Sequence, residues 1–392
     1  MPFYMILYIN LNNIYIQIQK LEKFIMKTNN KNKTVLIILL IVAVVLAAGT
    51  LLYKNFNAKP NASTSASKSK ISKIKLTRYQ KFKKFWHKMY AHLRTEKVIY
   101  SLRPLYNDKI NKIETYSLTL TSYDGLQLKG YFAIPYGVKG KKYPGVLLLH
   151  GYGSYGTPGW AHFFARRGYA ALSIDLRGHG RSATVYHPGF PGLMTNGILH
   201  VKSFSMVKIV MDSLASLRFL EHYKDINNKY IFVTGGSMGG GLSLIDAAID
   251  KHVTAAAGDV PFLSDIPVQM PLAKMGPYME VKAFLKKHPD DKSKVMRSLY
   301  YVDTKHFAKW IKVPVMIGIG LKDEDCPPKG TLVVYKMIKS KKKLFVAKNS
   351  GHVVLPGWNM EVFKFFAPYL PKYDKNAVKK NIKSNKNGRK FL

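Results

Sequence analysis

The chain has 392 residues, of which 47% are hydrophobic, so it can bury a sizeable core and is not disordered overall. Lys and Arg (62) far exceed Asp and Glu (22), giving a formal net charge of +40, which favours an anionic partner. No recognisable nucleic-acid-binding module accompanies the basic residues, which argues against DNA or RNA as that partner. The single cysteine, Cys326, excludes an intramolecular disulfide.

An uncharged hydrophobic run, TVLIILLIVAVVLAAGTLLY, occupies residues 34–53. As a helix it is long enough to cross about 30 Å of hydrocarbon. Lysines at 27, 31 and 33 precede it, which favours a cytoplasmic segment 1–33 and an external remainder. We therefore predict a single-pass protein of the cell membrane whose larger part is extracytoplasmic.

Two questions about this amino-terminal region stay open. Ala47, Ala48 and Gly49 permit cleavage after the hydrophobic run, although its length favours an uncleaved anchor. Met26, followed by a lysine, is an alternative start, so the first 25 residues need not belong to the protein.

The next segment, 54–111, begins as a stretch rich in Lys, Ser, Ala and Asn, which is typical of a flexible stalk. Large apolar residues then recur at helical spacing with lysines between them, at Tyr79, Phe82, Trp86, Met89 and Leu93. This pattern predicts an amphipathic helix. Packing on the globular domain is the favoured interpretation, and contact with anionic lipid is the alternative.

A globular domain is expected over residues 112–370, followed by a basic tail, 371–392. Alternation around a Tyr-Asp-Gly turn at 123–125 predicts a β-hairpin. Strand and helix patterns then alternate, which predicts an α/β fold with a mostly parallel sheet and helices on both faces. Residues 261–310 interrupt the alternation and are a candidate cap. The expected strands are 146–149, 169–174, 230–233, 253–260, 313–319 and 344–347, and the expected helices are 161–167, 205–220 and 331–338.

The stretch KYIFVTGGSMGGGLSLI, residues 229–245, combines a buried strand, a glycine-rich turn and an apolar helix. Within it, residues 235–239 spell G-x-S-x-G with Ser237 in the centre. In the nucleophile elbow this turn holds a serine hydroxyl clear of the sheet. The flanking strand and helix favour the elbow over a Gly/Ser-rich loop that matches by chance.

Ser237, Asp323 and His352 follow one another in the order nucleophile, acid, histidine, each on a loop after a predicted strand. The carboxyl ends of parallel strands gather at one edge of a sheet, so these side chains can meet there. The histidine would take the serine proton, and the carboxylate would orient the imidazole. Asp325 is an alternative acid, and Asp323 can also be read as a helix cap.

Several neighbouring residues complete or compete with this arrangement. The loop HGYG at 150–153 follows a strand and is expected to supply one oxyanion donor, the N–H of Tyr152, while Met238 supplies the other. His150 and His179 also lie on loops of this edge, but only His352 follows the last strand. Cys326 reads as a small buried residue. No HExxH, CxxC or clustered carboxylate pattern is present, so neither a metal nor a cofactor is expected.

Four segments within residues 131–370 resemble the acetyl xylan esterase and cephalosporin C deacetylase family, carbohydrate esterase family seven. They are HGYG at 150, GLMTNGIL at 192–199, DVPFLSD at 259–265 with Pro277-Tyr278 and YVDTKHF at 301–307, and GLKDEDCPP at 320–328. The resemblance implies an α/β-hydrolase fold, Tyr152 as oxyanion donor, Asp323 as triad acid, metal-free removal of acetyl groups from sugars or similar small esters, and a homo-oligomer.

The chain departs from that family at three positions near the expected site. His179 and Met238 stand where the family usually has glutamine, and Val353 stands where it has glutamate after the histidine. These changes leave the triad intact and bear on which substrate the protein acts on.

The sequence therefore predicts a membrane-anchored serine ester hydrolase that acts through an acyl-enzyme. Two alternatives remain: another acyl hydrolase of the same fold, such as a peptidase or a short-chain lipase-like enzyme, and an anchored envelope-binding protein. The basic stalk and tail would let either one associate with anionic envelope polymers or lipid.

Overall fold

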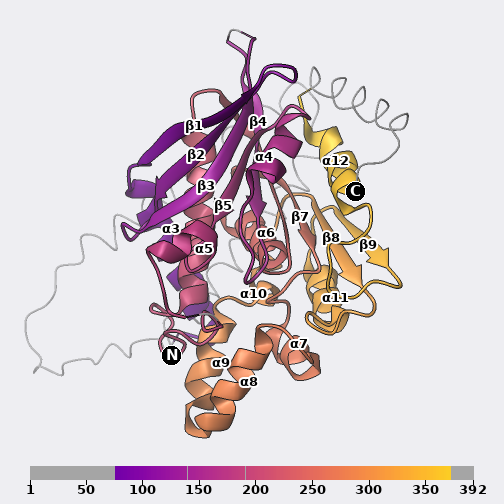
Figure 1. Cartoon of the computed structure of the whole chain (residues 1–392). Coiled ribbons are helices and arrows are strands. Elements are labelled where there is room, and N and C mark those ends of the chain that lie inside the picture. Colours follow the sequence, from indigo (N-terminus) through magenta and orange to yellow (C-terminus); the bar gives the residue numbers. More distant parts are fainter. Residues whose placement is uncertain (1–75, 139, 190, 372–392) are drawn as a thin grey trace, which may run out of the picture. The chain divides into compact units, whose positions relative to one another are not determined.

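Nine strands of the described residues form one mixed sheet (Figure 1). The computed structural model describes residues 76–371 without 139 and 190. In chain order the strands are β1 (Tyr100–Asp108), β2 (Ile113–Thr121), β3 (Gln127–Pro135), β4 (Tyr143–Leu149), β5 (Ala170–Asp175), β6 (Ile226–Gly236), β7 (Val253–Asp259), β8 (Val315–Gly320) and β9 (Lys342–Ala347). Across the sheet the order is β1-β2-β3-β5-β4-β6-β7-β8-β9.

The sheet is parallel from β5 to β9 and antiparallel at its other edge. β4 pairs in parallel with β5 and β6, and β7, β8 and β9 continue the parallel run. The predicted hairpin is β2 and β3, and β3 joins the parallel part by an antiparallel pairing with β5. Every residue of β4, β5 and β8 is buried, which explains their continuous apolar sequences. The mostly parallel sheet predicted from the sequence is confirmed.

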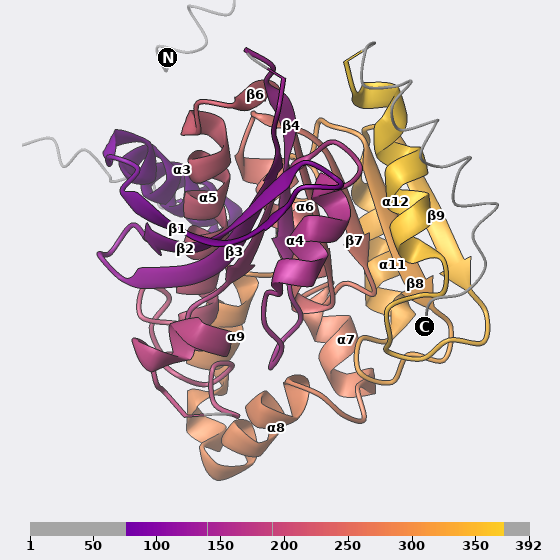
Figure 2. The same cartoon turned by 45° about the horizontal axis from the view of Figure 1, so that its top comes forward.

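Helices cover both faces of the sheet, as Figures 1 and 2 show. On β4, Val146 and Leu148 belong to the core that contains helices α4 (Pro158–Ala165) and α12 (Trp358–Phe366), with the short η3 (Ala367–Tyr369) after α12. Leu147 and Leu149 point to the other core, which contains α5 (Ser205–His222), α6 (Met238–Ile249) and α11 (Pro328–Met337). This division follows from the alternation of side chains along a strand.

The predicted amphipathic helix is α3 (Arg78–Thr95), and it packs on the domain. Phe82 and Trp86 are fully buried, and the Trp86 indole donates a hydrogen bond to the backbone carbonyl of Tyr301 at 2.9 Å. A capping box of Thr77 and Gln80 begins the helix. Together with β1, α3 belongs to the same compact unit as the rest of the described chain, so the sheet begins before the expected start at residue 112.

The interruption expected as a cap consists of α7 (Ile266–Leu272), α8 (Tyr278–Lys287), η2 (Pro289–Asp291), α9 (Lys292–Tyr300) and α10 (Thr304–Phe307). In Figure 1, α7, α8 and α9 lie beyond the carboxyl ends of the parallel strands. Asp303 holds the two ends of the cap together, because its carboxylate accepts the N–H groups of Asp265 and Ile266 at 2.9 and 2.8 Å. The DVPFLSD and YVDTKHF stretches, which together resemble one segment of the esterase family, therefore meet in space.

A buried ion-pair network fixes the loop that follows β5. The guanidinium of Arg177, only 1% exposed, contacts both carboxylate oxygens of Asp212 on α5 at 2.6 Å and those of Asp124 in the β2–β3 turn at 2.8 and 2.9 Å. The loop continues into η1 (Gly180–Thr184). The buried guanidinium is tolerated because it is paired with two carboxylates and hydrogen-bonded to both.

Within residues 76–371, apart from 139 and 190, no helix is long and apolar enough to cross a membrane. The predicted span at 34–53, the segment before it and the stalk lie outside the described residues, as does nearly all of the basic tail. The single-pass anchor therefore stays a prediction.

Candidate active site

Ser237 stands between the last residue of β6 and the first of α6, in a strained conformation with φ 54° and ψ −114°. The turn is possible only because glycines surround it. A Cβ on Gly239 would lie 1.9 Å from the carbonyl oxygen of Leu149, and one on Gly235 would lie 2.4 Å from the same atom. Such contacts are impossible, so the glycines of G-x-S-x-G allow α6 and β6 to approach β4 and expose the serine.

The structure brings Ser237, His352 and Asp323 into one line of contacts. Nε2 of His352 lies 2.9 Å from Oγ of Ser237, and Nδ1 lies 2.8 Å from Oδ2 of Asp323. Asp323 follows β8, and His352 lies in the loop after β9. The carboxylate is 1% exposed and the imidazole 18%, so the acid is enclosed while the histidine borders solvent.

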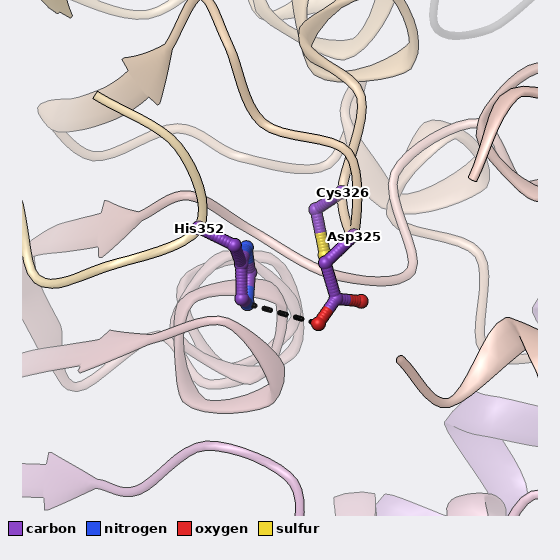
Figure 3. A group of neighbouring side chains, drawn as sticks. All are labelled: Asp325, Cys326 and His352. Atoms are coloured by element: carbon purple, nitrogen blue, oxygen red, sulfur yellow. Dashed lines mark ion pairs between the residues drawn. The ribbon is translucent and has the colours of Figure 1, made fainter. Parts of the chain in front are cut away.

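The backbone of the acid loop distinguishes Asp323 from the alternative acid. Oδ1 of Asp323 accepts the N–H groups of Asp325 at 3.0 Å and Cys326 at 2.7 Å, which fixes its carboxylate in an Asx-type turn. Asp325 lies instead on the other side of the ring, with Oδ2 3.8 Å from Nε2 of His352 (Figure 3). The geometry thus places Asp323, not Asp325, at the nitrogen that a histidine-orienting acid contacts.

Charge and burial act in opposite directions on the imidazole. Burial lowers the pKa of His352, but the hydrogen bond and charge of Asp323, followed by the charge of Asp325, outweigh it, so the pKa is raised above 6.5. Asp259 lies nearby, and burial raises its pKa to about 7. Its carboxylate accepts the N–H of Leu355 at 3.0 Å and thereby ties β7 to the loop that carries His352.

The loop after β4 lies directly beside the serine. A Cβ on Gly151 would be 3.5 Å from Cβ of Ser237, an ordinary contact distance. The next residue, Tyr152, is held by its hydroxyl, which donates to Oε1 of Glu280 on α8 at 2.7 Å. Oε2 of Glu280 accepts the N–H of Met194, 3.3 Å away, in the GLMTNGIL segment. Glu280 therefore connects the cap with both segments, a connection that the sequence analysis missed.

Met238 is the first residue of α6. N–H groups in the first turn of a helix lack an acceptor within the helix and can bind an anion. This is the position at which the sequence analysis expects the other oxyanion donor.

The competing histidines are buried in the wall behind the site. His150 accepts the N–H of Leu176 at Nε2, 3.1 Å away, so its Nδ1 is the nitrogen that donates to the carbonyl of Gly151. Burial lowers the pKa of His150 to about 4, and that of His179 to about 3. The two rings lie 4.8 Å apart, and neither is in the line of contacts with Ser237.

A cavity of about 530 Å³ opens above the serine. Its wall includes the elbow, the loop after β4, the cap residue Pro277 and the segment 352–354. Tyr155, Trp160, Trp358 and Asn359 also line it, and the sequence analysis named none of them because they come from segments without a motif. The departure at Val353 lies in this wall, 54% exposed.

Two groups of side chains in the described part of the chain bring potential metal-ligand atoms within 4.8 Å of one another. One is Asp325, Cys326 and His352 (Figure 3), where Nε2 of the histidine already contacts Ser237. Cys326 is 2% exposed, and burial raises the pKa of its thiol, which disfavours the thiolate that binds metals. The other, Glu221, Asp250 and His252, lies at the ends of α5 and α6, and Arg94 already pairs with its glutamate.

Two solved structures of acetyl xylan esterases are similar to this chain. An acetyl xylan esterase from Paenibacillus sp. R4 shares 28% identity at a TM-score of 0.70, covering 76% of this chain and 96% of that one. Acetyl xylan esterase 1 from Thermoanaerobacterium sp. JW/SL YS485 shares 25% identity at a TM-score of 0.66, covering 73% and 93%. Both support the α/β-hydrolase fold.

Among curated proteins, acetyl esterase Axe7A of Xylanibacter ruminicola is 26% identical over 285 residues, which are 70% of this chain. The chain spans only 63% of the length of that relative. Residues 70–369 match the family model described as acetyl xylan esterase (AXE1), which is well over half of the chain. The chain therefore belongs to the acetyl xylan esterase family.

Proposed function

We propose that this protein is a serine carboxylic-ester hydrolase that removes acetyl groups from carbohydrates or similar small esters. The observation that carries the proposal is the line of contacts from Ser237 through His352 to Asp323, at 2.9 and 2.8 Å, beneath a cavity of about 530 Å³. Family membership and the names of the relatives support acetyl as the acyl group.

In the first half of the reaction, Oγ of Ser237 attacks the ester carbonyl while Nε2 of His352 takes its proton. The resulting imidazolium is stabilised by Asp323, which holds the proton on Nδ1. The backbone N–H groups of Tyr152 and Met238 receive the oxyanion. When the tetrahedral intermediate collapses, His352 returns the proton to the leaving alcohol, and the acetyl group stays on Ser237.

In the second half, water replaces the alcohol. His352 takes a proton from the water molecule, whose oxygen attacks the acetyl-serine carbonyl, and the same two N–H groups receive the charge. Collapse breaks the bond to Ser237 as His352 returns the proton to Oγ, and the acetic acid that is released loses its remaining proton to solvent.

The direct test is the hydrolysis of p-nitrophenyl acetate and of acetylated xylo-oligosaccharides by Ser237→Ala. Its activity should fall to background, and a fluorophosphonate probe, mapped by mass spectrometry, should label only Ser237 in the wild-type protein. Ser154→Ala is the matched control, because Ser154 lines the same cavity and has no part in the mechanism. Full activity in Ser237→Ala, or labelling of another serine, contradicts the proposal.

The acyl preference separates this function from the rival hydrolases of the same fold. Acetyl esters should be cleaved much faster than octanoyl esters and aminoacyl amides at equal concentration. Faster cleavage of the amides would favour a peptidase, and faster cleavage of octanoyl esters a lipase-like enzyme.

We also propose that residues 34–53 anchor the protein in the cell membrane, with the catalytic domain outside and the basic stalk and tail against anionic envelope polymers or lipid. The uncharged run and the preceding lysines support the anchor. Removal of residues 1–75 and 371–392 should leave esterase activity intact and abolish salt-sensitive association with isolated envelopes. Unchanged association of the truncated protein argues against this role.

A further inference from the structure

A second carboxylate lies beside the imidazole that the proposed mechanism uses. Oδ2 of Asp325 is 3.8 Å from Nε2 of His352 (Figure 3), the same nitrogen that contacts Ser237. Asp325 also lines the cavity. Its side chain is 17% exposed, so it borders the cavity while most of it is shielded from bulk water. The mechanism assigns this carboxylate no step.

The position of Asp325 puts it on the side of the leaving alcohol. Nε2 of His352 has to deliver its proton to the alcohol oxygen, so that oxygen must come within hydrogen-bond distance of Nε2. A carboxylate 3.8 Å from the same nitrogen is then within a few ångströms of the alcohol part of the ester. The acyl oxygen, by contrast, points to the N–H groups of Tyr152 and Met238.

The two carboxylate oxygens of Asp325 differ in access. Oδ1 is buried against Gly276 of the cap, where a Cβ would come within 1.8 Å of it, so Oδ2 is the oxygen that a ligand in the cavity can reach. Among the described residues, no lysine or arginine contacts the carboxylate closely enough to pair with it. Glu324, the preceding residue, pairs instead with Lys274 at 2.5 Å on the surface.

The rest of the cavity wall is also suited to a positively charged ligand. Although the chain has 62 lysines and arginines, none is among the described residues that line the cavity. The only other acid there, Asp259, is turned to the backbone of Leu355. Four aromatic side chains complete the wall, Tyr152, Tyr155, Trp160 and Trp358. A carboxylate combined with aromatic rings is the environment that binds an organic ammonium group.

We propose that Asp325 selects acetyl esters whose alcohol part carries an ammonium group, such as an amino sugar or another amino alcohol. The inference rests on the proposed esterase function and narrows its substrate class. Asp325 pairs with the ammonium group of the bound ester, and the aromatic wall contacts the same group. Neutral acetyl esters are cleaved by the same triad without this added contact.

A pair of esters of the same shape tests the proposal. Acetylcholine and 3,3-dimethylbutyl acetate differ in charge and hardly in shape. The wild-type protein should cleave the cationic ester with a kcat/KM about fivefold or more above that of the neutral one, as expected for one partly exposed carboxylate. Asp325→Asn should bring the ratio to about one. Glu324→Gln is the matched control, because it removes the adjacent acid at a position that faces away, and it should keep the wild-type ratio.

The ratio of kcat/KM for the cationic ester to that for the neutral ester separates pairing of Asp325 with the substrate from a merely electrostatic effect of Asp325 on His352. If Asp325 only stabilises the imidazolium, Asp325→Asn changes both esters equally, the ratio stays constant, and the proposal is overturned. A wild-type ratio of one or below overturns it as well. Activity on the neutral ester that requires Ser237 shows that the esterase function itself holds whichever result is obtained.

A measurement on the wild-type protein covers the case in which Asp325→Asn fails to fold. Choline should inhibit hydrolysis of the neutral ester more strongly than its uncharged analogue 3,3-dimethylbutanol, and added salt should reduce the difference. Equal inhibition by the two alcohols would refute the selection of an ammonium group.

Discussion

Asp323→Asn should lower kcat by at least about 30-fold, because the loop fixes which way the new amide points. Oδ1 of Asp323 accepts two backbone N–H groups, from Asp325 and Cys326. An asparagine must keep its oxygen there, since turning the amide would exchange two hydrogen bonds, about 1 kcal/mol each, for two opposed donors. A preference of about 2 kcal/mol corresponds to roughly 30 to 1. The amide NH₂ therefore faces His352.

The wrong tautomer follows from this orientation. An amide donor forces Nδ1 of His352 to accept, so the ring proton moves to Nε2, the nitrogen that has to take the proton of Ser237. KM should change little, because Asp323 is enclosed and does not reach the substrate. Steady-state hydrolysis of p-nitrophenyl acetate measures both constants, and thermal unfolding shows whether the variant is folded.

Asp325→Asn in the same assay tests which acid orients the histidine. On this neutral ester it should retain kcat within about tenfold of the wild type, because Asp325 faces Nε2 and not Nδ1. If folded Asp323→Asn kept more than about a tenth of the wild-type kcat, or if Asp325→Asn were the more damaging change, the assignment of Asp323 would be refuted.

Three further predictions concern pH, the cap and stability. The acid limb of the pH profile of kcat/KM should lie above pH 6.5, because the neutral ring of His352 is the active form and its pKa is raised. Burial lowers that pKa, but Asp323 raises it more. An acid limb at or below pH 6.5 contradicts this prediction. Glu280→Gln should lower kcat about tenfold, since an amide cannot accept from both the Tyr152 hydroxyl and the backbone N–H of Met194. A kcat within about twofold of the wild type argues against a role of Glu280 in positioning Tyr152. Arg177→Met should lower the free energy of unfolding in urea by about 3–5 kcal/mol by leaving Asp212 buried and unpaired, and adding Asp212→Asn should restore part of it. A loss below about 1 kcal/mol would show that the pair is dispensable.

The parallel half of the sheet could be predicted because its strands carry a strong signal. β4, β5 and β8 are buried on both faces and read as unbroken apolar runs. β1 could not be predicted, since seven of its nine residues are exposed and it lacks the alternation that marks a half-buried strand. Only its pairing with β2 defines it as a strand.

The residues of the site likewise include some that the sequence could predict and others that it could not. Ser237 and His352 could be found because the elbow has a local motif and the histidine follows the last strand. The choice of Asp323 over Asp325 rested on the resemblance of the GLKDEDCPP segment to the esterase family, because a spacing of two residues does not encode which carboxylate the loop backbone holds. Glu280 was out of reach, because its contact with Tyr152 spans 128 residues and exists only once the cap is folded.

Burial makes the exterior of this protein more basic than its composition suggests. Nine acidic side chains of the described residues are buried, against two basic ones, Arg177 and Arg218. The buried acids are Asp175, Asp212, Glu221, Asp246, Asp250, Asp259, Asp265, Asp303 and Asp323. Lysines therefore dominate the field at the surface, while Asp325 determines the charge that a substrate meets in the cavity. At physiological salt, screening removes the field of the surface lysines beyond about 8 Å, but it acts less on a mostly buried carboxylate such as that of Asp325. Salt should thus weaken attachment to polyanions at concentrations that leave much of the ester selectivity in place.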